Sequence, residues 1–139
     1  MGLLDVNALV ALVWDSHVHH VSIRRGFAQN ASAGWATCPL TESGFVRVSS
    51  NPKALPAVVT VADARLALVS LRSAAGHRFL VDDVSLADAD VPAIHGYRQV
   101  TDVHLLTLAR RHGQRLVTFD VAMLTHDGGA GDVELLTGL

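Results

Sequence analysis

Apolar and polar residues are arranged along this chain in two alternating patterns. Short apolar runs predict β-strands at 2–5, 35–38, 78–81, 115–119 and 133–136. Longer stretches, with an apolar residue every three or four positions, predict helices near 7–14, 18–31, 39–49, 60–75, 101–112 and 120–125. Strands that alternate with helices are typical of a parallel sheet covered on both faces. The pattern therefore predicts an α/β fold.

Helix and loop signals support these boundaries. Thr60, followed three residues later by Asp63, resembles a capping box, and Gly76 lies where the same helix would stop. Asn51-Pro52 and Pro56 mark a loop between two helices. Because the chain contains no repeat, linker or low-complexity segment, we expect a single domain over residues 1–139.

Composition narrows the class of protein. Half of the 139 residues are hydrophobic and 17% are charged, which excludes a disordered chain. The single cysteine, Cys38, cannot form an internal disulfide and fits a reducing compartment. Asp5 and Asn7 interrupt the first apolar stretch, which argues against a signal peptide. No apolar run reaches the roughly 18 residues of a transmembrane helix. We expect a cytoplasmic protein with no membrane contact.

The charge of the chain limits how it could bind a polynucleotide. A formal net charge of −2 excludes a strongly basic nucleic-acid binder. A nucleic acid would have to be held by a local basic patch or by metal ions.

Four acidic residues lie where such a fold would bring them to one end of the sheet. Asp5 and Asp120 directly follow predicted strands, and ligands of parallel sheets bind beyond the carboxyl ends of the strands. Glu42 and Asp102 stand in the first turns of two predicted helices, on the apolar side. Gathered carboxylates repel one another until a cation compensates them, and their hard oxygens suit Mg²⁺ or Mn²⁺. The pattern predicts a metal site.

Most of these acids also have a structural explanation when taken singly. Asp102 could cap its helix or complement the helix dipole, and Asp120 could be the N-cap of the last short helix. Asp5 could accept hydrogen bonds from a helix N-terminus. Glu42 is harder to explain in this way because it lies past the first residues of its helix. Only the joint placement of the four favours a metal site over capping.

Five segments of the chain carry a family resemblance that spans nearly its whole length. They are LLDVNALVAL, HVHH, PLTESGFVRV, TDVHLLTLARRHG and LVTFD, in this order. Together they resemble PIN-domain ribonucleases, and most closely the VapC-type toxins of bacterial toxin–antitoxin pairs. The resemblance implies a three-layer α/β/α domain whose central parallel sheet has four to five strands in the order 3-2-1-4-5. It also implies that the residues matching the four catalytic acids, Asp5, Glu42, Asp102 and Asp120, bind Mg²⁺ or Mn²⁺.

Two polar residues match supporting positions of the same family. The resemblance implies that Asn7 supports the site by hydrogen bonding, although Asn7 could equally be the N-cap of the first helix. Thr118 matches a frequent Ser or Thr, and it could orient a water or only satisfy backbone at the strand end. The chain departs from the family at Val103 and Val121, which puts substrate contacts on that side in doubt.

The function implied by the resemblance is a metal-dependent endoribonuclease that acts as a toxin. Such an enzyme hydrolyses phosphodiester bonds in structured RNA, such as tRNA or ribosomal RNA, and thereby inhibits translation and growth. The implied partners are a VapB-like antitoxin, the RNA substrate and a second copy of the chain in a homodimer.

Two other interpretations of the acidic cluster stay open at this point. A phospho-accepting receiver domain would need an acidic pair at the first strand end and a Lys after the last strand, but the only Lys is Lys53. A non-catalytic family member that only binds its antitoxin would keep the same acids. His17, His19 and His20 could suggest a transition-metal site, but no spaced cysteine or carboxylate completes it, so packing or helix-start roles are favoured.

Overall fold

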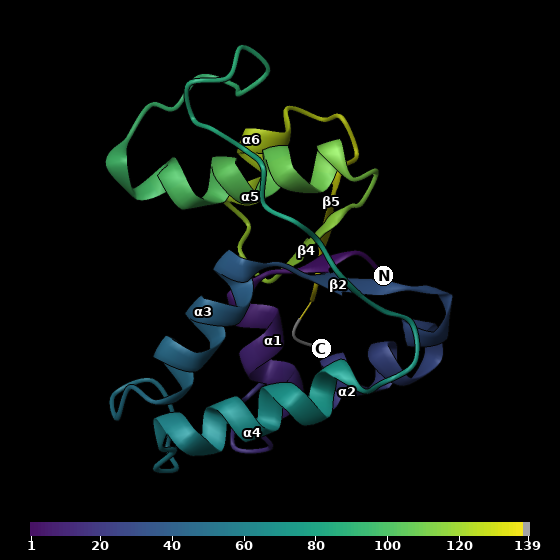
Figure 1. Cartoon of the computed structure of the whole chain (residues 1–139), viewed down its shortest axis with the longest axis vertical. Helices are drawn as coiled ribbons and strands as arrows, with labels where there is room; N and C mark the ends of the chain where they lie inside the picture. Colours follow the sequence, from purple (N-terminus) through teal and green to yellow (C-terminus); the bar gives the residue numbers. More distant parts are fainter. Residues whose placement is uncertain (138–139) are drawn as a thin grey trace.

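Five parallel strands form one sheet through the middle of the protein, as the computed structural model of residues 1–137 shows (Figure 1). The strands are β1 (Leu3–Leu4), β2 (Trp35–Thr37), β3 (His77–Phe79), β4 (Leu116–Thr118) and β5 (Val133–Leu135). Their order is β3-β2-β1-β4-β5, and every neighbouring pair is parallel. The predicted α/β class and strand order are therefore confirmed. The last two residues of the predicted domain, 138–139, lie outside the described residues.

Six α-helices connect and cover the strands. They are α1 (Val6–Val13), α2 (His20–Asn30), α3 (Pro39–Ser49), α4 (Val61–Arg72), α5 (Val100–Arg111) and α6 (Met123–Asp127), with short 3₁₀ turns at Ala31–Ala33 and Tyr97–Gln99. Within residues 1–137, none of the helices combines the length and the apolar character needed to cross a membrane.

Two predicted helices differ from the observed ones for local reasons. The helix expected at 18–31 begins only at His20, because residues 15–19 form turns in which His17 Nδ1 accepts a hydrogen bond from His19 N. The helix expected at 120–125 is shifted to Met123–Asp127. It starts later because Asp120 Oδ1 accepts a hydrogen bond from Ala122 N and so forms a turn before the helix.

Successive residues of the central strand point to opposite faces of the sheet and so divide the core in two. Leu4 packs on the side of α1 to α4, in a core that includes Leu9, Trp35, Phe45 and Val117. Leu3 packs on the side of α5 and α6, in a core that includes Ala36, Leu105, Leu116 and Met123. The helices lie on both sides of the sheet, α1 to α4 on one and α5 and α6 on the other (Figure 1). This is the expected three-layer arrangement.

A glycine sets how closely α3 approaches α1. A Cβ atom at Gly44 would lie only 2.5 Å from Val6 Cγ2, which is closer than real carbon atoms approach. Glycine therefore allows the two helices to pack tightly near their N-termini. This packing holds α3, whose first turn carries Glu42, against the start of α1.

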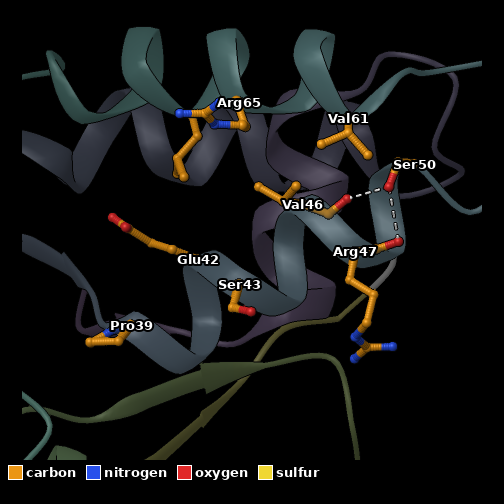
Figure 2. A pocket seen from close by; sticks show the side chains of 9 residues that line it. Pro39, Glu42, Ser43, Val46, Arg47, Ser50, Val61 and Arg65 are labelled. Atoms are coloured by element: carbon orange, nitrogen blue, oxygen red, sulfur yellow. Dashed lines mark hydrogen bonds between the residues drawn. The ribbon is translucent and has the colours of Figure 1, made fainter.

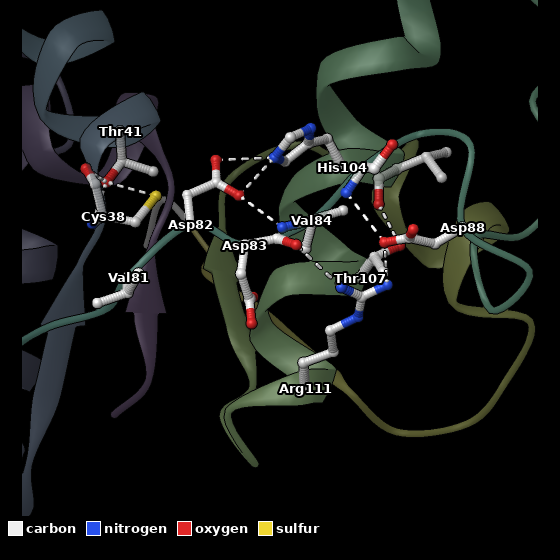
Figure 3. A network of polar contacts seen from close by, with 12 residues as sticks. Cys38, Thr41, Val81, Asp82, Asp83, Val84, Asp88, His104, Thr107 and Arg111 are labelled. Carbon is white, nitrogen blue, oxygen red and sulfur yellow. Dashed lines mark hydrogen bonds and ion pairs between the residues drawn. The ribbon is translucent and has the colours of Figure 1, made fainter.

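A long connection leads from β3 to α5, and α5 itself holds it in place. Arg111 donates hydrogen bonds to the carboxylates of Asp88 and Asp90. His104 Nε2 lies 2.8 Å from Asp82 Oδ2 (Figure 3). Since charge-assisted hydrogen bonds are the stronger kind, these pairs attach the connection to the helix that carries Asp102.

Candidate active site

The two acids that follow strands lie at adjacent strand ends. Strand β1 pairs with β4 so that Leu4 is opposite Val117, and Asp5 N donates a 2.9 Å hydrogen bond to Val117 O. Asp120 lies two residues beyond the end of β4. Both acids are therefore at the carboxyl edge of the sheet, where the chain order reverses and ligands of α/β proteins usually bind.

Asp5 is held by two hydrogen bonds in a nearly closed environment, with 8% of the residue exposed. Its Oδ1 accepts from Val6 N at 2.7 Å, which makes Asp5 the N-cap of α1. Its Oδ2 accepts from Thr118 Oγ1 at 2.8 Å. Burial raises the pKa of Asp5, the hydrogen bonds from Thr118 and Val6 oppose that increase, and the charge of Asp120 adds to it. The capping explanation for Asp5 is correct but leaves its second oxygen directed to the strand end.

Thr118 and Asn7 connect the acids to one another. The Thr118 hydroxyl gives its proton to Asp5 and accepts hydrogen bonds from Asp120 N at 3.0 Å and Asn7 Nδ2 at 3.2 Å. Asn7 Oδ1 accepts from Phe119 N at 3.2 Å. The N-cap of α1 is Asp5, so the alternative that Asn7 caps this helix is wrong. Both residues instead brace the carboxyl ends of β1 and β4.

Asp102 approaches the same place from α5. The helix begins at Val100 with Gln99 as N-cap, so Asp102 lies in its first turn and is not the capping residue. Its side chain is 25% exposed. Burial raises the pKa of Asp102, followed by the charges of Asp5 and Asp120. The structure thus brings three of the four predicted acids within electrostatic reach of one another.

Glu42 is engaged elsewhere. Its Oε1 accepts a 2.9 Å hydrogen bond from Thr37 Oγ1, at the end of β2, and lies 3.4 Å from Arg72 Nε of α4. Figure 2 shows Glu42 at the wall of a pocket of about 590 Å³ between α3 and α4, which Arg47 and Arg65 also line. Glu42 is not among the charges that shift the pKa of Asp5 or Asp102. Its expected role as a metal ligand stays a prediction.

The carboxylate oxygens of the site are suitable ligands for a divalent cation, although they do not converge on one point in this structure. Carboxylate oxygens are the ligands that Mg²⁺ and Mn²⁺ prefer, and a cation would relieve the repulsion among Asp5, Asp102 and Asp120. Within residues 1–137, no three His, Cys, Asp or Glu side chains converge closely enough to hold a metal ion as they stand. The acids would therefore have to move together on binding.

Two of the three N-terminal histidines have separate packing roles. His20 Nδ1 lies 2.9 Å from Ala11 O, and His19 stacks on Phe119 with ring centroids 4.8 Å apart. His19 is the N-cap residue of α2, and His20 is the first residue of that helix. These contacts fit the expected packing and helix-start roles.

One residue that lies beside the acids was not predicted from the sequence. His126, on α6, has its Nε2 atom 3.9 Å from Asp102 Oδ2. Nothing in the pattern of residues around it indicates a site, because its position depends on the turn that Asp120 forms before α6. Only the three-dimensional structure brings the two side chains together.

Comparison with known proteins identifies close relatives. The sequence profile of the PIN domain matches residues 2–127. The chain is 67% identical to Ribonuclease VapC38 of Mycobacterium tuberculosis (strain ATCC 25618 / H37Rv), over 99% of each protein. It is 50% identical to Ribonuclease VapC39 of the same organism, over 97% of this chain and 99% of the relative.

A solved structure agrees with the fold. The crystal structure of Mycobacterium tuberculosis VapC20, a Sarcin-Ricin loop cleaving toxin, superimposes with a TM-score of 0.64 over 97% of this chain and 98% of the other. The two sequences are 14% identical, so this likeness concerns the fold alone.

Proposed function

This chain belongs to the VapC ribonucleases of the PIN-domain family, and on that premise we propose that it is a metal-dependent endoribonuclease, the toxin of a toxin–antitoxin pair. The observation that carries the proposal is that Asp5, Asp102 and Asp120 lie close enough for their charges to interact. They come from three distant segments, and at the edge of the sheet the charge of Asp120 helps to raise the pKa of Asp5, while the charges of Asp5 and Asp120 help to raise the pKa of Asp102. A protein without a cationic ligand gains nothing from such repulsion.

The chain's own residues would hold the ion and keep its ligands in place. Asp5, Asp102 and Asp120 would hold a divalent ion, which would supply an activated water and neutralise charge on the attacked phosphate. Thr118 keeps Asp5 directed to the strand end, and Asn7 braces the segment that leads to Asp120. In the reaction, water adds its OH to phosphorus and its remaining proton to the leaving 3′ oxygen. The products carry a 5′-phosphate and a 3′-hydroxyl.

The proposed substrate is structured RNA, such as tRNA or ribosomal RNA, cut at an unpaired loop. Loops suit the site because their backbone can bend toward the carboxylates, whereas a helix cannot. Cleavage of such an RNA would inhibit translation and growth. With a net charge of −2, the protein depends on the ion and on local arginines to bind this polyanion.

The proposed protein partners are a VapB-like antitoxin and a second copy of the chain. The antitoxin would place a basic side chain among the acids, where it replaces the cation as the compensating charge. Expression of the chain alone in bacteria, compared with co-expression of its antitoxin, tests the toxin part of the proposal. Normal growth in both cases would contradict it.

Cleavage assays test the enzymatic part. Purified protein with Mn²⁺ or Mg²⁺ should cut end-labelled RNA, and Asp5→Asn should lower the rate by roughly a hundredfold or more, as expected when a charged group at the reacting centre is lost. Asp90→Asn, on the surface connection before α5, is the matched control and should cleave as wild type does. Full activity in excess EDTA, or an undiminished rate for Asp5→Asn, would refute the mechanism. The ends of RNA isolated after brief induction would identify the target.

One observation favours a second candidate function. Glu42 is paired with Arg72, and the other three acids do not converge as they stand. A non-catalytic member that only binds its antitoxin would look the same. Calorimetry separates the two, because the inert protein would not bind Mn²⁺. Membership in the PIN family sets aside the alternative of a phospho-accepting receiver domain.

A further inference from the structure

A buried histidine nitrogen beside the acids lacks a hydrogen-bond partner. His126 Nε2 is closed off from solvent and has no partner among residues 1–137. The His126 side chain is only 8% exposed. A buried polar atom without a partner costs about 1–3 kcal/mol, so native proteins rarely keep one. An unpaired atom of this kind points to an interaction with a polar group close by.

The nearby acceptor is a carboxylate of the candidate site. Asp102 Oδ2 lies 3.9 Å from His126 Nε2, about 1 Å beyond a normal N–H···O hydrogen bond. A modest rotation of the Asp102 side chain would close this gap. The carboxylates must already move together to bind an ion, so both changes involve the same side chain.

The short helix that carries His126 is fixed at both of its ends. Its neighbour Asp127 has a buried side chain that accepts hydrogen bonds from Gly131 N, Asp132 N and Arg110 Nη2. At the other end of α6, Met123 is fully buried in the core. Because both ends of this short helix are fixed, the buried side chain of His126 is held close to Asp102.

From this geometry we infer that His126 is a positioning residue: its Nε2–H donates to Asp102 Oδ2 and so orients this carboxylate, which would bind the divalent ion. The inference rests on the proposed function, since it assigns Asp102 to that ion. Groups that orient a metal-binding carboxylate typically change metal affinity or activity by about 10–100-fold when they are removed. The segment after β4 thus supplies both Asp120 and the residue that orients Asp102.

Three variants test the inference in the full-length protein. His126→Leu removes the donor, His126→Gln keeps an N–H donor near the same place, and His95→Leu is a matched control at an exposed histidine. Calorimetry with Mn²⁺ and cleavage of a defined RNA would be measured for each. His126→Leu should bind Mn²⁺ about 10–100-fold more weakly and lower kcat more than it changes KM. His126→Gln and His95→Leu should stay within about threefold of wild type, well short of that loss.

Two outcomes would overturn the inference. If His126→Leu binds Mn²⁺ as wild type does, His126 has no part in the site. If His126→Gln is as weak as His126→Leu, the imidazole is itself a metal ligand, because glutamine retains the donor but does not replace a ligating nitrogen.

A measurement without metal separates this inference from the proposed function. Long-range ¹H–¹⁵N spectra of the metal-free protein should show the proton of His126 on Nε2, and Asp102→Ala should change that tautomer balance. Identical spectra for the two proteins would refute the contact, even if the Leu variant fails to fold. If wild type neither binds Mn²⁺ nor cuts RNA, the proposed function fails, while these spectra still decide whether His126 donates to Asp102.

Discussion

Thr118 donates its hydroxyl proton to Asp5, with Oγ1 2.8 Å from Oδ2, and so joins the ends of two neighbouring strands. The same oxygen accepts hydrogen bonds from Asp120 N and Asn7 Nδ2. One fully buried hydroxyl therefore sets the positions of two candidate ligands at once.

Removal of this hydroxyl should damage both stability and activity. Thr118→Val keeps the shape of the side chain but leaves a buried carboxylate oxygen and a backbone N–H without their partner. We expect a loss of about 1–3 kcal/mol in the free energy of unfolding, measured by urea denaturation. Thr118→Ser retains the hydroxyl and should lose less than half as much. Equal losses in the two variants would show that packing of the methyl group, and not the hydroxyl, matters.

The acids should make the metal-free protein less stable at neutral pH. The pKa of Asp102 is raised in the folded state by burial and by Asp5 and Asp120. A raised pKa means that the folded state binds the proton more tightly, so stability is highest below the ordinary value of 3.8 and falls as the pH rises through the folded pKa. In EDTA at pH 7, Asp102→Asn should therefore melt at a higher temperature than wild type.

The higher melting temperature of Asp102→Asn relative to wild type should be lost under two conditions. It should shrink as the pH falls through the raised pKa of Asp102 and the wild-type carboxyl takes up its proton. In excess Mn²⁺ at pH 7 the order should reverse, because an ion that binds the folded state stabilises wild type more. Thermal melts across pH, with and without Mn²⁺, check both. A variant that is less stable than wild type in EDTA at neutral pH would contradict the repulsion among these acids.

The different burial of Asp127 and Asp132 predicts that their replacement will change the free energy of unfolding by unequal amounts. The side chain of Asp127 is 4% exposed and that of Asp132 is 38% exposed, although both pair with Arg110. Asp127→Ala leaves buried donors unpaired and should cost about 3 kcal/mol in the free energy of unfolding. Asp132→Ala, near solvent, should cost less than about 1 kcal/mol. Chemical denaturation of both variants measures the difference, and similar costs would rule out a buried anchor at Asp127.

The connection before α5 should loosen when Arg111 is removed. Arg111 donates to the carboxylates of Asp88 and Asp90 and to Asp83 O. In Arg111→Ala we expect faster hydrogen exchange of the amides at 82–90, because their attachment to α5 is lost. Arg115→Ala is the control, since Arg115 lies 3.9 Å from Glu134 of β5 and donates to Val133 O of the same strand. Unchanged exchange in Arg111→Ala would show that apolar packing alone holds the segment.

The close packing at Gly76 should be sensitive to a single methyl group. Gly76 has a φ of +84°, and a Cβ there would overlap Ala31 O. Gly128 has a φ of +63° with open space around it. Gly128→Ala should cost about 1 kcal/mol from backbone strain alone, while Gly76→Ala should cost at least about 2 kcal/mol because backbone must also move. Equal melting temperatures for the two variants would contradict this difference.

The sequence predicted the architecture well because each element has a local signal. The apolar spacing over 39–49 predicted α3 at its observed bounds, and Thr60 with Asp63 forms the expected capping box of α4. Strand order came from the family resemblance, since no local signal determines which strands pair. The starts of α2 and α6 were predicted two or three residues too early, because the turns at His17 and Asp120 depend on side-chain hydrogen bonds.

The site was predictable only in part. Strand ends and helical phase predicted the places of Asp5, Asp102 and Asp120, because periodicity reports which face of an element a residue occupies. The orientation of Glu42 toward Arg72 depends on how α4 packs against α3, and no pattern within either helix encodes that contact. His126 likewise acquires its neighbour through the fold of another segment.

The strand order also bears on how a cell makes this protein. The central strand β1 is synthesised first, but its neighbour β4 and the acid Asp120 come near the end of the chain. A ribosome must therefore translate most of the message before the three carboxylates can meet. A prematurely terminated product that stops before β4 carries Asp5 and Asp102 but lacks Asp120, so we expect it to be inactive.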